Sequence, residues 1–173
     1  MDEVLKAVKE RRSIRSFLKK EIPDDIIKKL IEALIWAPSA GNLQARKFYF
    51  VKNKDTKGKL AQAALYQTFI ADAPLVIVGC IDKNKIFPRY GQRGVQLYAI
   101  QDVATSITNA MLVAHENGLG SCWVGAFREE EVSKILALPK HLRSVVILPV
   151  GYPAYVPSAP PRVSINEAVE FVE

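Results

Sequence analysis

Cysteine is scarce in this 173-residue chain, and long apolar runs are missing. Only Cys80 and Cys122 occur, which argues against a framework of several disulfides. A membrane-spanning helix needs about 18 consecutive apolar residues, and no stretch approaches that length. The first residues mix acidic with apolar side chains and show no cleavable hydrophobic segment. We therefore expect a reduced, cytoplasmic protein with no membrane partner.

Common catalytic and nucleotide-binding motifs are also missing. The chain has no P-loop, and the residues after Gly118-Leu119-Gly120 do not complete a Gly-x-Gly-x-x-Gly fingerprint. There is no Cys-x-x-Cys pair, and His115 and His141 stand alone, so no metal-ligand spacing is present. The nucleophile elbow of serine hydrolases is absent as well. We expect no metal and no catalytic side chain, so any chemistry should come from a bound cofactor.

The residues that are present suit one globular domain in which helices and strands mix. Hydrophobic residues make up 49% of the chain and charged residues 24%, which is ordinary for a folded domain. Apolar residues at helical or strand-like spacing predict the elements. The expected helices cover 2–10, 24–36, 55–70, 96–117 and 129–137, and the expected strands cover 47–52, 75–81, 121–127 and 145–150. We expect a loop at 84–94, an extended arm from 151 to 161, a short element at 164–172, and a buried apolar stripe at 26–35 with Trp36 and Trp123 in the core.

The chain carries a net charge of +6, which favours anionic partners such as nucleic acid, a membrane surface or a phosphorylated small molecule. Arg11, Arg12, Ser13 and Arg15 place three guanidinium groups and a hydroxyl within five residues. Guanidinium forks bind phosphate oxygens through charge-assisted hydrogen bonds. Residue chemistry alone leaves a solvated basic turn, a nucleic-acid patch and a small-molecule phosphate site open. Phe17 is the one close aromatic, which does not favour base stacking.

Several segments in order along the chain narrow these alternatives. They are Arg-Arg-Ser-Ile-Arg-Ser-Phe at 11–17, Ala-Pro-Ser-Ala-Gly-Asn-Leu-Gln at 37–44, Ala-Pro before the apolar run at 73–78, Gln-Asp-Val at 101–103 with Asn109, Gly-Leu-Gly-Ser-Cys-Trp-Val-Gly-Ala-Phe at 118–127, Leu-Pro-Val-Gly-Tyr-Pro at 148–153, and Pro-Pro-Arg at 160–162. Together they resemble the nitroreductase family of FMN flavoproteins over nearly the whole chain.

The resemblance implies an α+β fold, a three-layer α/β/α sandwich around a mostly antiparallel sheet, in an intertwined homodimer. It implies one FMN-binding domain over 1–173 with an extended C-terminal arm, about 153–173, that packs on the partner subunit. It also implies an FMN-dependent NAD(P)H oxidoreductase. NADH or NADPH would pass hydride to flavin N5, and the flavin would then reduce a small electrophile such as a nitroaromatic, a quinone or another flavin, in a ping-pong reaction.

The resemblance also assigns roles to particular residues. It implies that the ribityl phosphate is held by Arg11, Arg12, Ser13 and Arg162, that Arg15 approaches the N1 and O2 edge of the flavin, that Gln67 binds the pyrimidine edge, that the backbone of Gly125 and Ala126 lies beside N5, and that Pro38, Ser39, Ala40 and Asn42 reach the flavin from the partner subunit. Two departures from the family pattern stand out. Pro160 occupies a position where many members have a basic residue, and the short segment 83–94 predicts an open site bordered by Phe87, Arg89 and Tyr90.

Two other functions stay open at this point. One is a specialised reaction on the same flavin scaffold, such as dehydrogenation or dehalogenation. The other, from a different class, is a basic nucleic-acid-binding module that uses residues 11–20. The resemblance favours a small-molecule electron acceptor and a second copy of the chain as the partners, with no nucleic acid.

Overall fold

A four-stranded antiparallel sheet forms the centre of the computed structural model, which describes residues 2–172. The strands are β1 (Arg46–Val51), β2 (Leu75–Asp82), β3 (Gly120–Ser121) and β4 (Leu142–Gly151), in the order β1-β2-β4-β3. Strand β2 pairs on both edges, and all of its residues except Asp82 are buried. This burial explains why β2 lacks polar alternation, because helices cover both of its faces.

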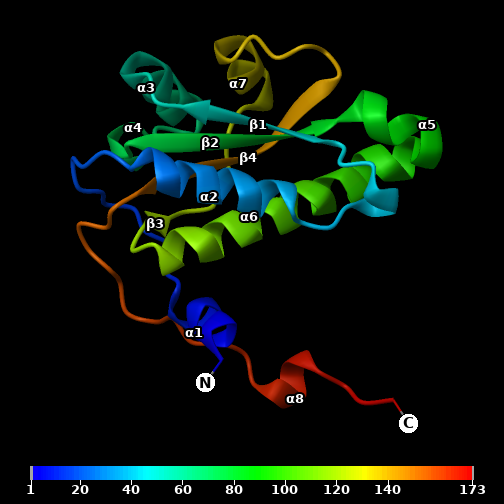
Figure 1. Cartoon of the computed structure of the whole chain (residues 1–173). Helices are drawn as coiled ribbons and strands as arrows, with labels where there is room; N and C mark the ends of the chain where they lie inside the picture. The colour runs from blue at the N-terminus through cyan, green and yellow to red at the C-terminus, as the bar shows by residue number, and fades with distance from the viewer. Residues whose placement is uncertain (1, 173) are drawn as a thin grey trace.

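Helices lie on both sides of this sheet (Figure 1). They are α1 (Glu3–Glu10), α2 (Asp24–Ile35), α3 (Lys54–Ala63), α4 (Phe69–Asp72), α5 (Lys83–Arg93), α6 (Ala99–Glu116), α7 (Glu129–Ile135) and α8 (Ile165–Ala168), with a 3-10 turn η1 (Ala40–Asn42) and a π-helical segment η2 (Gly94–Tyr98). Helices α2 and α6 pack on one face, and α3, α4 and α7 pack on the other.

Alternate side chains of β2 enter two separate cores. Leu75 and Ile77 belong to the core with α2 and α6, whereas Val76 and Val78 belong to the core with α3 and α7. This alternation is the period-two geometry of a strand, here with apolar residues at both phases. The expected three-layer α/β/α sandwich is therefore confirmed. Within residues 2–172, none of the helices has the length and apolar character needed to cross a bilayer.

The expected loop at 84–94 is wrong, because this segment forms helix α5. Asp82 caps the helix, since its Oδ1 accepts hydrogen bonds from the backbone N–H groups of Asn84 at 3.0 Å and Lys85 at 3.3 Å. Such a cap satisfies donors that a helix start leaves free. Gly91, a residue typical of loops, sits at a kink with φ +53° near the helix end. The cap at Asp82 was the sequence signal that could have revealed α5.

Two other expected elements are only partly formed. The helix expected at 55–70 is interrupted, because Leu65 and Tyr66 adopt positive φ angles of 57° and 61° between α3 and α4. The strand expected at 121–127 shrinks to β3 and a single bridge between Val124 and Ile147. In both cases an apolar sequence continues through a break in backbone geometry.

The tryptophans and the apolar stripe of α2 are more exposed than expected. Trp36 is 84% exposed and Trp123 is 38% exposed, so neither is a core residue and this expectation is wrong. Leu30 and Leu34 are fully buried, but Ile35 is 55% exposed. The stripe of α2 is thus wider than the area that the sheet and α6 cover.

Residues 154–172 leave the body of the domain as an extended arm, and α8 is the one short helix in this described part of it (Figure 1). Its apolar side chains are largely exposed: Tyr155 is 68% exposed and Phe171 is 85% exposed. The packing of this arm on a partner subunit stays a prediction.

Candidate functional site

The basic segment that follows α1 runs in extended form beside the short edge strand β3. Ser13 forms a parallel bridge with Ser121, and the N–H of Ile14 donates to the carbonyl of Ser121 at 2.9 Å. The approach is so close that a Cβ atom on Gly120 would overlap the side chain of Ile14. Glycine at 120 therefore lets the basic segment lie against the sheet, which holds its backbone in one conformation.

Because the segment is extended, its side chains alternate between two sides. Arg11, Ser13 and Arg15 share the side that faces Cys122. Burial raises the pKa of the Cys122 thiol, and the charges of Arg15 and Arg11 and a hydrogen bond with Ser13 act in the opposite direction. Burial also lowers the pKa of Arg11, as do the positive charges of Arg162 and Arg12. The charge of Arg162, on the C-terminal arm, thus acts on Arg11, although Nη1 of Arg162 itself donates to the carbonyls of Pro160 at 3.2 Å and Pro161 at 3.1 Å.

Arg11 has donor capacity that the protein itself does not use. Its Nη1 atom is buried without a hydrogen-bond partner, and so is Oγ of Ser121. Arg12 differs, because its Nη1 donates to the backbone carbonyls of Lys9 at 2.6 Å and Arg11 at 2.9 Å. Buried polar groups are nearly always paired, so an orphaned guanidinium nitrogen beside another arginine fits a phosphate ligand. Of the two neighbouring arginines, Arg11 is the better placed for that role.

Gln67 and Ala126 meet although 59 residues separate them in the chain. The side-chain Nε2 of Gln67 donates to the carbonyl of Ala126 at 3.2 Å and to the carbonyl of Ala64 at 2.9 Å. At Gly125, a Cβ atom would contact only Nε1 of Trp123, at 3.7 Å. Packing within the chain does not require glycine there, so the backbone at 125–126 is left accessible beside Gln67.

The loop Pro38–Asn42, which includes η1, is pinned at the start of α6. The N–H of Ala40 donates to Oδ1 of Asp102 at 2.8 Å, and Oγ of Ser39 accepts from the N–H of Gln44 at 3.0 Å. Asn42 has a φ of +54°, a left-handed conformation that asparagine tolerates better than most residues. The four residues predicted to reach a flavin, Pro38, Ser39, Ala40 and Asn42, therefore sit on a well-fixed turn.

Arg46 supports this loop from below, a role that the sequence analysis missed. Its buried guanidinium donates to four backbone carbonyls, those of Ile35, Ala37, Pro38 and Asp102, at 2.7–3.3 Å. Burial lowers the pKa of Arg46, and the charge of Asp102 acts in the opposite direction. Burial raises the pKa of Asp102, while the hydrogen bond from Ala40 and the charge of Arg46 lower it. Arg46 of β1 thus donates to the carbonyls at and just after the end of α2.

Helix α5 borders the same loop. Gly41 has a φ of +54°, and a Cβ atom placed there would lie 2.6 Å from Oη of Tyr90 and 3.1 Å from Nη1 of Arg89. Glycine is required both by the backbone conformation and by this contact. Of the three residues expected to border the site, Arg89 and Tyr90 lie against the loop, and Phe87 is 51% exposed on the same helix.

The predicted ligands form two groups at opposite ends of α6. Loop Pro38–Asn42 is bonded to Asp102 in its first turn, whereas Ser13 is bridged to Ser121, just beyond its last turn. A helix of this length spans about 27 Å at about 1.5 Å per residue. Figure 1 shows the loop and β3 at opposite ends of this helix. Within one chain the two groups do not meet.

Comparison with known proteins decides the family. The model of the nitroreductase family matches residues 8–152. The chain belongs to the nitroreductase family. An FMN reductase [NAD(P)H] of Bacillus subtilis is 30% identical over 186 residues, which cover 100% of this chain and 74% of that protein. The resemblance noted in the sequence is confirmed.

Other nitroreductase-family relatives agree. A Methanothermobacter thermautotrophicus protein, whose name proposes NADH dehydrogenase/NAD(P)H nitroreductase activity, is 31% identical over 159 residues, 90% of this chain and 80% of that protein. The solved structure of NfrA1 from Bacillus megaterium superposes with a TM-score of 0.88 at 31% identity, covering 98% of this chain and 74% of that one.

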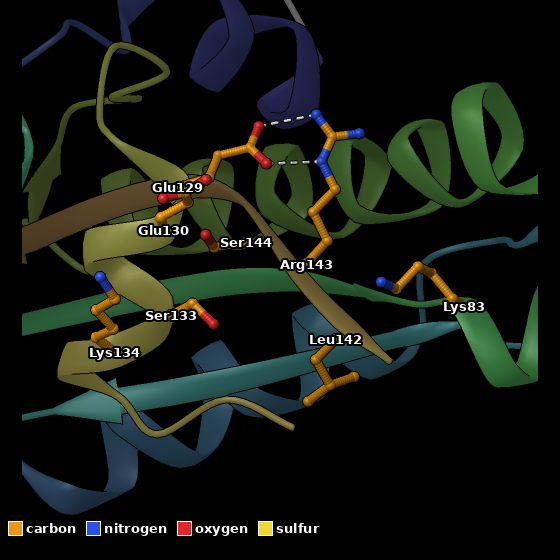
Figure 2. Close-up of a pocket in the computed structure, with 8 residues that line it drawn as sticks. All are labelled: Lys83, Glu129, Glu130, Ser133, Lys134, Leu142, Arg143 and Ser144. Atoms are coloured by element: carbon orange, nitrogen blue, oxygen red, sulfur yellow. Dashed lines mark hydrogen bonds and ion pairs between the residues drawn. The ribbon is translucent and has the colours of Figure 1, made fainter. Parts of the chain in front are cut away.

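The nitroreductase fold of this chain also carries a cleft away from the predicted ligands. It lies between α7 and the start of β4, has a volume of about 450 Å³, and is lined by Lys83, Glu129, Glu130, Ser133, Lys134, Leu142, Arg143 and Ser144 (Figure 2). Arg143 donates from Nε and Nη2 to the Glu129 carboxylate, each at 2.8 Å. Across residues 2–172, no group of three or more His, Cys, Asp or Glu side chains could hold a metal ion.

Proposed function

We propose that this protein is an FMN-dependent NAD(P)H oxidoreductase that reduces a small electrophile. Membership of the nitroreductase family and the name of the Bacillus subtilis relative, FMN reductase, support the activity. The observation in this chain that carries the proposal is the buried Nη1 of Arg11, which has no hydrogen-bond partner. The positive charges of Arg162 and Arg12 act on the same guanidinium. That arrangement leaves a concentrated positive charge with unused donors, which an FMN phosphate would satisfy.

Each side chain has a positioning task in this proposal. Arg11, Ser13 and Arg162 hold the phosphate, assisted by Arg12, and Arg15 lies at the N1 and O2 edge of the ring. When bound, FMN supplies hydride acceptance at N5 and donation to the second substrate. The guanidinium of Arg15 would place a fixed positive charge at that edge of the ring, where it would favour the anionic, reduced form of the cofactor.

Gln67 and the exposed backbone at 125–126 complete this half of the site. The Gln67 side chain is held by its bonds to the carbonyls of Ala64 and Ala126, so it presents its amide at a fixed position for the pyrimidine edge. The N–H groups of Gly125 and Ala126 would face N5, with that of Ala126 as the hydrogen-bond donor. No side-chain acid or base takes part.

A second copy of the chain completes the site. The loop Pro38–Asn42 lies about one length of α6 from Ser13, so we place Pro38, Ser39, Ala40 and Asn42 on the flavin of the partner in a homodimer. The exposed apolar face of α1, α2 and α6 supports such an interface: Trp36 and Val4 (72% exposed) line a cleft of about 400 Å³ there. A two-fold interface buries the same face of both chains. The arm at 153–173 would then pack on the partner.

The site shape points to a small-molecule acceptor, such as a nitroaromatic, a quinone or a flavin. Helix α5 borders the loop without covering the backbone at 125–126. Cys80 and Cys122 are both free and buried, in keeping with a cytoplasmic location. Ping-pong exchange of the nicotinamide and the acceptor over one open flavin face is the reaction order that this geometry favours.

Reconstitution and stopped-flow absorbance test the proposal. The purified protein, incubated with excess FMN and desalted, should retain a yellow chromophore, elute as a dimer, and be bleached by NADH or NADPH and recoloured by a quinone. A colourless protein that retards DNA in a salt-sensitive manner would instead favour the nucleic-acid alternative. Flavin that is bound but not reoxidised by nitroaromatics or quinones would point to a specialised reaction.

A further inference from the structure

Arg89, on the exposed side of α5, carries a charge that no carboxylate among residues 2–172 neutralises. The ion pairs among residues 2–172 join Lys52 to Asp24, Arg128 to Glu131 and Arg143 to Glu129, and none includes Arg89. Its guanidinium makes no hydrogen bond within that part of the chain and lies 5.5 Å from the ring of Tyr90. Arg89 is therefore free to bind an anion from solution.

The structure holds Arg89 beside the predicted flavin loop. Its Nη1 would lie 3.1 Å from a Cβ on Gly41, so the guanidinium contacts the η1 turn directly. The helix beneath it is rigidly placed, because Tyr90 packs edge-on against Tyr98 with ring centroids 5.3 Å apart. Gly94 makes this packing possible, since a Cβ there would lie 2.7 Å from the Cβ of Tyr90. Arg89 thus has a defined position at the mouth of the site.

This position is distinct from the cluster assigned to the FMN phosphate. Arg11 lies beyond the far end of α6 from the η1 turn, so Arg89 and Arg11 cannot grip one phosphate within a chain. In the homodimer proposed above, the partner's η1 turn would lie at the ring end of the flavin, opposite its phosphate. Arg89 would therefore meet whatever molecule approaches that ring, and not the resident cofactor's own phosphate.

We propose that Arg89 binds a phosphate group of the substrate that approaches the flavin, with Tyr90 and Tyr98 forming an aromatic wall beside it. The group is a terminal phosphate monoester, and two substrates carry one: NADPH at its 2′-phosphate, and free FMN used as the acceptor, whereas NADH carries only the pyrophosphate bridge. A guanidinium fork suits phosphate because it donates two parallel hydrogen bonds. This inference rests on the proposed function, since it requires a flavin at the partner's η1 turn.

Steady-state kinetics of the FMN-loaded protein separates the two sources. The first arm measures the ratio of kcat/KM for NADPH to that for NADH with a quinone acceptor, and the second measures the ratio for free FMN to that for riboflavin. In Arg89→Gln we expect one of these ratios to fall about tenfold, because the pair of charge-assisted hydrogen bonds that is lost is partly exposed to solvent. Arg89→Lys keeps the positive charge but lacks the planar guanidinium. The affected ratio in this variant should lie between those of Arg89→Gln and the wild type.

Lys83→Gln is the matched control, because Lys83 lies on the same helix but lines the cleft by α7 (Figure 2). It removes the same charge and should leave both ratios unchanged. Unchanged ratios in Arg89→Gln, or an equal fall of a ratio in Lys83→Gln, would overturn this inference. The proposed function would still stand in that case, provided that the protein binds FMN and turns over. Wild-type protein that retains no FMN would overturn the proposed function, and this inference with it.

Discussion

Replacing Arg11 with methionine tests whether its guanidinium binds a ligand or stabilises the fold. In the flavin-free protein Nη1 is buried without a partner, and the charges of Arg162 and Arg12 oppose that of Arg11. A buried donor without a partner costs about 1–3 kcal/mol, and we take the lower end because the side chain is only half-buried. For a domain of this size about 1 kcal/mol corresponds to about 2–4 °C in Tm. We expect Arg11→Met to raise the Tm of the apoprotein by about that amount.

The same substitution should weaken FMN binding, although it stabilises the apoprotein. A hydrogen bond to a charged group contributes about 1.5–3 kcal/mol, so losing it should weaken FMN binding by about 10- to 100-fold. Thermal melting of the apoprotein and fluorescence titration with FMN measure the two effects. Titration with riboflavin, which lacks the phosphate, should show a much smaller change.

Two further variants complete this test. Lys9→Met removes an exposed charge from the end of α1 and should alter neither quantity appreciably. Arg12→Met should weaken FMN binding less than Arg11→Met, because Nη1 of Arg12 is already bonded to backbone carbonyls. A lower apoprotein Tm together with unchanged FMN affinity in Arg11→Met would show that Arg11 supports the fold, and the phosphate assignment would be refuted.

Three other predictions concern the supports of the site and the second cleft. Arg46→Met should cost about 3–5 kcal/mol in urea unfolding, because it leaves the Asp102 charge and several carbonyls without their buried partner; an equally stable variant would contradict this reading. Burial raises the pKa of Asp102, so the native state takes up a proton before the unfolded chain does as pH falls, and this group's contribution to stability rises as the pH drops through that raised pKa. Asp102→Asn keeps an oxygen acceptor for Ala40 and should remove that slope in urea midpoints measured between neutral and mildly acidic pH; an unchanged slope would exclude Asp102 as its source. For Glu129 and Arg143 a double-mutant cycle with Glu129→Gln and Arg143→Met should give a coupling of about 0.2–1 kcal/mol, since both side chains are more than 40% exposed. The hydrogen bond from Arg143 lowers the pKa of Glu129, so this coupling is present at neutral pH and is lost as the pH falls through that lowered pKa; a coupling that persists in acid would contradict the assignment.

The spacing of apolar residues predicted helices and strands correctly where one face, or both faces, of the element is buried. The apolar stripe of α2 and the continuous apolar run of β2 predicted both elements, because their side chains must reach a core. The loop expected at 84–94 failed for a local reason as well: Gly91 suggested a turn, while the Asp82 cap that starts α5 was overlooked. Trp36 was expected in the core, yet a single chain leaves it 84% exposed.

The motif residues were found in the sequence, but their arrangement was not. The sequence does not distinguish the neighbouring residues Arg11 and Arg12. In the structure, the bridge between Ser13 and Ser121 orients this segment so that Arg11 lies on the side of Cys122, where the charge of Arg162 also acts on it. Arg46 gave no signal at all, because its four acceptors are backbone carbonyls that any sequence would supply.

By itself the sequence predicted the layered arrangement of helices on a sheet from hydrophobic spacing, and the family from motifs confined to short segments; the ligand-binding residues that these motifs suggest stay a prediction. Tertiary structure alone decided that Gln67 meets Ala126, that Arg89 lies on the η1 turn, and that the predicted ligands divide between the two ends of α6. Such contacts join residues far apart in the chain. They depend on how helices and strands pack in three dimensions, which local propensity does not encode.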